Sequence, residues 1–132
     1  MRKNTPPIRN IFSSKATTGS GTVVSVSDWK HIVLQIGTAS SANLTLKIQG
    51  SISDTAPNFS SAATSSNHWD YVGAYDLNTG LFVSGDTGFV VAGTDDFVNY
   101  GVNVDGIKWL CATVTAISAG SVTVNAGVFD NE

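Results

Sequence analysis

The sequence predicts an all-β protein, an antiparallel two-sheet β-sandwich or jelly roll of about eight strands. Strong helix formers are scarce, with one glutamate and one methionine in 132 residues, whereas Thr, Ser, Val, Gly and Asn are plentiful. Short runs alternate between apolar and polar residues, which is the two-residue period of a half-buried strand. Clusters of Gly, Asn, Asp and Ser separate these runs at short spacing, as in sandwich folds rich in hairpins.

Length and composition indicate one folded domain. A mass of 13.7 kDa is enough for a single hydrophobic core. Apolar residues make up 42% of the chain and charged residues only 13%, the opposite of the composition that keeps a chain disordered.

The first 21 residues are predicted to form an extended N-terminal arm, and residues 22–132 the sandwich domain. Pro6 and Pro7 force extended backbone, and small, flexible residues follow Phe12. Residues 1–27 hold four basic residues and no acid, whereas the rest of the chain holds three lysines and ten acids. Such a basic leader on an acidic body is typical of an arm that binds a partner. Its candidate contacts with a partner or a neighbouring subunit are Arg2, Lys3, Ile8, Arg9, Ile11, Phe12 and Lys15.

The first three strands are expected at residues 22–26, 31–36 and 43–52. Residues 31–36 form a short apolar run that is predicted to be buried on both faces. In the third run Leu44, Leu46, Ile48 and Ile52 share one face, which makes it the clearest half-buried strand. A polar loop follows over residues 53–67, and loops of that length tend to bind partners.

The remaining strands are separated by turns, and the longest of them is residues 107–117. They are expected at residues 69–75, 81–83, 88–92, 97–104, 107–117 and 121–129. Residues 76–80 form a turn, Asp105–Gly106 gives the sharpest hairpin signal, and Ala119–Gly120 is predicted to be the last turn.

No arrangement of residues predicts catalysis, a metal site or a cofactor. His31 and His68 are far apart, and Cys111 stands alone inside an apolar strand, where a thiol behaves as a small hydrophobe. The chain is therefore not expected to be an enzyme. The acidic body disfavours nucleic acid, and neither a membrane span nor a signal peptide is expected.

Two runs, residues 31–36 and 107–117, carry apolar residues on both faces. Because each sheet of a small sandwich should keep one wet face, this pattern predicts that another subunit covers part of the outer surface. The expected homo-oligomer has as candidate interface residues Pro57, Phe59, Trp69, Leu110 and Val114.

The pattern of turns and strands resembles small β-sandwich virion proteins of tailed bacteriophages. The resemblance rests on residues 49–51, 53–59, 67–77, 85–88, 104–109 and 119–124. Such proteins are often capsid cement, or decoration, proteins that form trimers on the outside of the phage head. For a cement protein the resemblance implies a homotrimer, made in the host cytoplasm and located on the capsid surface, that fastens neighbouring major capsid proteins. Other proteins of this kind belong to tails, baseplates or head fibres, and the resemblance does not separate these locations.

Two functions are expected from these observations. In the first, the chain is a structural virion protein whose arm attaches it to the capsid, so that deleting residues 1–15 removes attachment and leaves the sandwich folded. In the second, it is a carbohydrate- or receptor-binding module of a tail fibre, baseplate or head fibre. The site would then consist of Trp29, Trp69 and the long polar loop.

Overall fold

A computed structural model describes residues 8–93 and 97–128 of the chain. These residues form strands, turns and loops and contain no helix, and therefore no helix that could cross a membrane. The strands are β1 (Ile8–Lys15), β2 (Gly19–Ser20), β3 (Val24–Ser25), β4 (His31–Ser51), β5 (Asp70–Val72), β6 (Ala74–Asp76), β7 (Phe82–Val83), β8 (Phe89–Gly93), β9 (Phe97–Asn103) and β10 (Trp109–Val128).

All pairings are antiparallel and join the strands into one continuous sheet. The main path runs β1-β10-β4-β9-β6-β7, while β2 and β3 pair with β10, and β5 and β8 pair with β4. The all-β, antiparallel prediction is confirmed. The pairing differs from the expected two separate sheets, because both layers share the two longest strands.

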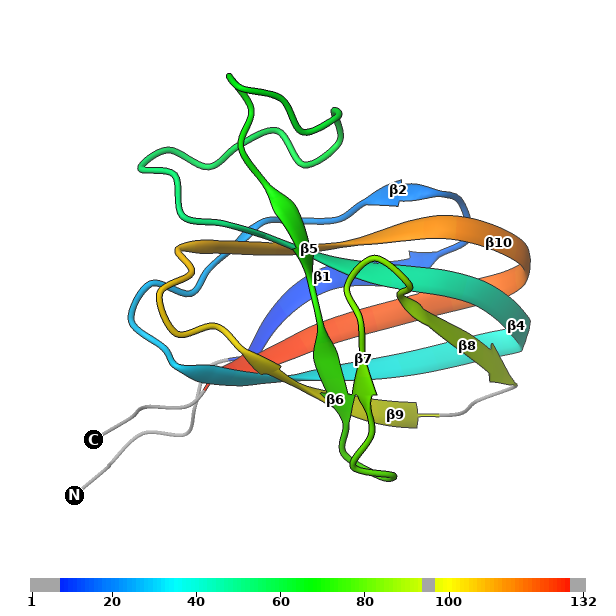
Figure 1. Cartoon of the computed structure of the whole chain (residues 1–132). Coiled ribbons are helices and arrows are strands. Elements are labelled where there is room, and N and C mark those ends of the chain that lie inside the picture. The colour runs from blue at the N-terminus through cyan, green and yellow to red at the C-terminus, as the bar shows by residue number, and fades with distance from the viewer. Residues whose placement is uncertain (1–7, 94–96, 129–132) are drawn as a thin grey trace.

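These two strands, β4 and β10, pair along their whole length, from Trp109 opposite Ser51 to Val128 opposite Ile32. Both ribbons bend sharply at the same end of the molecule and fold the sheet into two layers (Figure 1). The register shifts three times between Val114 and Ser121, and Gly120 has a φ of 74° at the bend. The predicted turn at Ala119–Gly120 is therefore a bulged corner within one strand, since bulges bend a strand without ending it.

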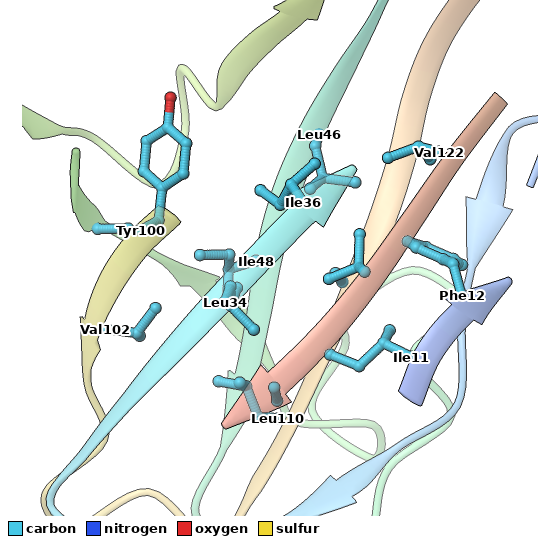
Figure 2. Packing of buried hydrophobic residues seen from close by; sticks show 14 of the residues in the cluster. Ile11, Phe12, Leu34, Ile36, Leu46, Ile48, Tyr100, Val102, Leu110 and Val122 are labelled. Carbon is cyan, nitrogen blue, oxygen red and sulfur yellow. The ribbon is translucent and has the colours of Figure 1, made fainter. Parts of the chain in front are cut away.

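The core lies between the two layers and is lined by the alternating apolar residues of β4. Leu46 and Ile48 point inward from its second half, and Leu34 and Ile36 from its first half (Figure 2). Leu44 and Ile32, on the same two halves, are also buried. From the other strands, the stacked rings of Phe89 and Tyr100 lie 4.1 Å apart, and Leu110 and Val122 complete the packing.

Two details of the predicted strands are wrong. Ile52 lies just beyond β4 and leaves 70% of its surface exposed, rather than sharing the buried face of Leu44. The run at residues 31–36 is buried on one face only. Ile32, Leu34 and Ile36 form the buried face, whereas His31 and Gln35 are exposed on the other.

The N-terminal segment belongs to the sheet from Ile8 onward. Strand β1 pairs with the last part of β10, and a register shift between Asn10 and Phe12 marks a bulge. Because a bulge interrupts the alternation of side chains, both Ile11 and Phe12 turn into the core, where they are 2% and 4% exposed (Figure 2). The structure thus corrects the expectation that these two side chains anchor the chain on a partner.

Candidate interaction surfaces

The outer face of β10 is covered by the chain itself near Cys111. Gln49 and Cys111 are directly opposite each other and almost fully buried on this face. The Gln49 amide donates to the carbonyl oxygen of Phe59 at 2.8 Å, and the Ser20 hydroxyl donates to the same oxygen and to Gln49 Oε1, both at 3.0 Å. Residues 19–21 and the 53–69 loop therefore cover the face that the sequence assigned to another subunit.

This cover corrects three of the predicted interface residues. Leu110 and Val114 point into the core of their own chain and are at most 1% exposed. Phe59 is 4% exposed, because its ring belongs to the covering loop. Pro57 and Trp69 are half-buried on the same loop and keep part of their surface open.

Cys111 is held as a neutral thiol beneath this cover. Burial raises its pKa, and the thiol lies within hydrogen-bond distance of the carbonyl oxygens of Gly21 and Ala112. The thiol is therefore a packing group rather than a nucleophile. Among the described residues, no three His, Cys, Asp or Glu side chains come together where they could hold a metal ion.

The 53–69 loop has almost no regular secondary structure, yet side-chain hydrogen bonds order it throughout. Asn67 is its centre: Oδ1 accepts from the backbone N–H of Asn58 at 2.8 Å, and Nδ2 donates to the carbonyl oxygens of Asn58, Ser61 and Ala62 at 2.9–3.4 Å. The indole N–H of Trp69 donates to the Ser61 carbonyl at 2.9 Å. The loop is thus organised before any partner arrives.

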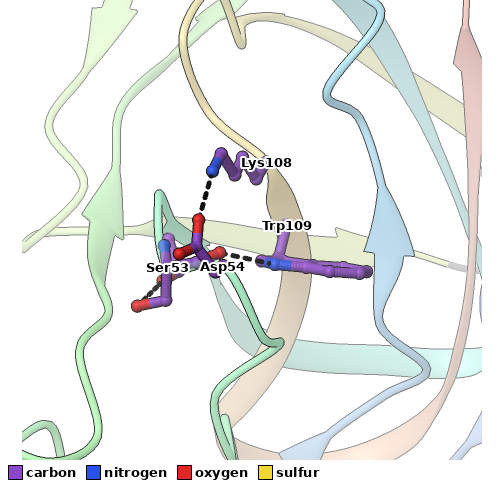
Figure 3. A network of polar contacts seen from close by, with 5 residues as sticks. Ser53, Asp54, Lys108 and Trp109 are labelled. Carbon is purple, nitrogen blue, oxygen red and sulfur yellow. Dashed lines mark hydrogen bonds and ion pairs between the residues drawn. The ribbon is translucent and has the colours of Figure 1, made fainter.

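Two further contacts fix the start of the loop to β10 (Figure 3). The Trp109 indole N–H donates to the Ser53 carbonyl at 2.9 Å, and Lys108 Nζ lies 2.8 Å from a carboxylate oxygen of Asp54. The hydrogen bond and charge of Lys108 lower the pKa of the Asp54 carboxyl group. This carboxylate is fully exposed, so the ion pair orients the loop more than it stabilises the fold.

Two hollows flank the loop. The first, called here the apolar groove, has a volume of about 530 Å³ and is lined by Ile52, Val72, Ile107 and Trp69, with Gly50, Ser51, Ala63, Thr64, His68 and Asp70 completing its walls. The second, called here the polar pocket, has a volume of about 420 Å³ and is lined by Ser53, Thr55, Ala56, Pro57, Asn58, Ser65, Ser66, Asn67 and His68. His68 lines both, so the two hollows adjoin. Trp29 is in neither and packs against the core.

A separate group of exposed apolar side chains lies on the β6–β7 hairpin and the neighbouring strand β9. This hairpin patch consists of Tyr75, Leu77, Leu81, Phe82 and Phe97, which are 51–70% exposed. The Tyr75 and Phe82 rings are 5.1 Å apart, in an edge-to-face arrangement. Glycines underlie the patch: an added Cβ would meet Phe82 at Gly73, Phe97 at Gly37 and Leu77 at Gly101. The absent side chains let these apolar groups lie flat on the sheet.

The other described residues predicted to contact a partner from the arm are not buried in the core as Ile11 and Phe12 are. Arg9 and Ile8 are exposed on edge strand β1, and the Lys15 ammonium lies 5.5 Å from the centre of the Phe12 ring. Arg2 and Lys3 lie outside the described residues. Exposed charge on an edge strand also discourages unwanted pairing with other sheets.

No protein-family model and no curated protein matches this sequence. Two solved structures share the fold. The SPBc2 prophage-derived protein YomS superimposes with a TM-score of 0.65 and 11% identity, over 97% of each chain. The PBSX exported protein XepA superimposes with a TM-score of 0.60 and 14% identity over 97% of this chain, which spans only 39% of the length of XepA. Both neighbours are phage-derived, and at such identity the likeness extends to the fold alone.

Proposed function

We propose that this chain is a structural protein of a phage particle that binds another protein through the hairpin patch. The observation that carries the proposal is the clustering of five large apolar side chains on one hairpin and its neighbouring strand. Exposed apolar patches mark interaction sites on soluble proteins, and within this group the Tyr75 and Phe82 rings are in direct contact. The fold shared with two phage-derived proteins supports the proposal that the chain belongs to a phage.

The specific role proposed is that of a capsid cement, or decoration, protein on the outside of the phage head. The partner is then the major capsid protein, and the chain acts by fastening neighbouring copies rather than by catalysis. A homotrimer is the proposed oligomer, and the hairpin patch is its proposed contact with the major capsid protein. In this role Ile8 and Arg9, both exposed on edge strand β1, supply a further contact with the capsid.

The position of the chain in the particle tests this role. Immunogold labelling of purified particles of the encoding phage should mark the head. Leu81→Glu, in the patch, should lose the label, whereas Val90→Glu should retain it, because Leu81 and Val90 are 67% and 68% exposed and only Leu81 belongs to the patch. Circular dichroism checks that both variants fold. Unlabelled heads, or equal labelling of the two variants, would contradict the proposal.

A second candidate is a receptor-binding module of a tail fibre, baseplate or head fibre. It is favoured by the ordered loop and the apolar groove beside Trp69, a combination suited to a ligand. The same labelling experiment separates the candidates, because this module would appear on fibres or the baseplate.

A further inference from the structure

We infer that the 53–69 loop binds a neutral saccharide that carries acetamido groups, across the apolar groove and the polar pocket. The inference concerns the loop alone and holds wherever the chain sits in a particle. Its success or failure is therefore independent of the hairpin patch.

The first argument is the order of the loop. Phe59 closes the cover over β10, whereas residues 60–66 are exposed and are nevertheless fixed by the Asn67 and Trp69 hydrogen bonds. Figure 1 shows the loop projecting beyond the two layers of the sheet. A site ordered in advance loses less conformational entropy when a ligand binds.

The second argument is the chemistry of the polar pocket, where the hydroxyl groups of four Ser and Thr residues and the amides of Asn58 and Asn67 stand beside Ala56, Pro57 and His68. Within the described residues, the hydroxyl groups of Thr55 and Ser65 and the imidazole of His68 make no hydrogen bond to the chain, so they are available to a ligand. None of the described residues that line this pocket is a lysine, an arginine or a carboxylate. Uncharged donors and acceptors of this kind match the hydroxyl groups of a neutral sugar.

The third argument is the adjoining apolar groove. Its volume of about 530 Å³ is within the range of small-ligand sites, and Ile52, Val72 and Ile107 give it an apolar wall. A simple sugar has little apolar surface to pack against such a wall, whereas the methyl group of an acetamido substituent can pack there. His68 lines both hollows, and Trp69 adds an aromatic ring to the apolar groove, held in place by the hydrogen bond from its indole N–H to the Ser61 carbonyl.

Titration with triacetylchitotriose, followed by isothermal calorimetry, tests the inference on the full chain. Saturable binding is expected at ligand concentrations up to about 10 mM. Maltotriose has similar hydroxyl groups and no acetamido group, so it should bind at least about fourfold more weakly, the effect of burying one methyl-sized group.

Two pairs of variants locate the site. Thr55→Val should weaken triacetylchitotriose binding about fivefold through loss of one hydrogen bond, while Thr87→Val, the same change on an exposed turn, should not. Ile52→Ser should weaken it about tenfold, while Val90→Ser, at a similarly exposed position, should not. The two control positions, Thr87 and Val90, lie outside both hollows, whereas Thr55 lines the polar pocket and Ile52 the apolar groove. No saturable binding, equal affinity for maltotriose, or insensitivity to both site variants would overturn the inference.

Discussion

Replacing Phe12 by alanine tests whether strand β1 belongs to the core of this chain or serves a partner. The Phe12 side chain is 4% exposed and packs beside Ile11 against β10. Truncating a buried phenylalanine costs about 3–5 kcal/mol, and the loss of the Lys15 contact with the ring adds about 0.5–1 kcal/mol. Since domains of this size unfold with about 5–15 kcal/mol, we expect at least about a fifth of the stability to disappear.

Urea denaturation followed by tryptophan fluorescence measures this loss, and thermal unfolding should show a Tm lower by about 10–20 °C. Ile8→Ala is the matched control on the same strand, because Ile8 is 71% exposed and its truncation should change stability by less than about 0.5 kcal/mol. Deletion of residues 1–15 should be at least as destabilising as Phe12→Ala, contrary to the expectation from sequence. An unchanged Tm in either the deletion or Phe12→Ala would refute the packing of β1.

Burial raises the pKa of both Cys111 and Tyr100, and the Asp76 carboxylate adds to the effect on Tyr100. A pKa raised in the folded state contributes stability below the ordinary values of 9.0 and 10.0 that is lost as pH rises, so the Tm should fall progressively above about pH 9; a constant Tm up to pH 11 would contradict this. The Cys111 thiol should react with Ellman's reagent only in denaturant, and fast reaction of the native protein would show that the cover over β10 is open. Asn67→Ala should lower stability by about 1–3 kcal/mol and speed proteolysis within the 53–69 loop, whereas Asn78→Ala, on an exposed turn, should do neither; equal behaviour of the two variants would contradict the central role of Asn67.

The sequence predicts strands well wherever alternation is uninterrupted. Leu44, Leu46 and Ile48 are all buried on one face, as the two-residue period requires. Strand β1 escaped prediction because its bulge buries two consecutive residues, Ile11 and Phe12, and no local period remains. Its partner residues lie more than one hundred positions away in β10, so only the pairing reveals that the segment belongs to the sheet.

The bent corners show a second limit of local patterns. Ala119–Gly120 has the composition of a turn, and Gly120 adopts the positive φ that a turn requires. Ser40 and Ser41, opposite this corner on β4, also have positive φ values, of 62° and 56°. A hairpin turn and a bulged corner require the same residues. After a turn the two flanking segments pair with each other, whereas at a bulged corner both continue to pair with the same neighbouring strand.

The candidate surfaces were harder to predict because a strand with two apolar faces does not reveal what covers it. On β10 the cover is the chain's own loop, fixed by Gln49 and the Phe59 carbonyl. A second subunit and a returning loop remove the same surface from water, and composition alone does not distinguish them. The loop in turn placed Trp69 beside a groove, so the residue that resembled an interface contact is a ligand-site candidate.

The opposite case is the hairpin patch, where the strands β6 and β7 are too short to show any period. The exposed side chains of Phe97, Phe82 and Leu77 lie close against the sheet because Gly37, Gly73 and Gly101, respectively, leave room beneath them. A flat apolar surface can approach another flat surface closely, whereas protruding side chains would hold the two apart. Substituting a glycine beneath the patch should therefore weaken partner binding by tilting the rings, without altering any residue that touches the partner. The geometry of the sheet, rather than hydrophobicity alone, makes this surface suitable for docking.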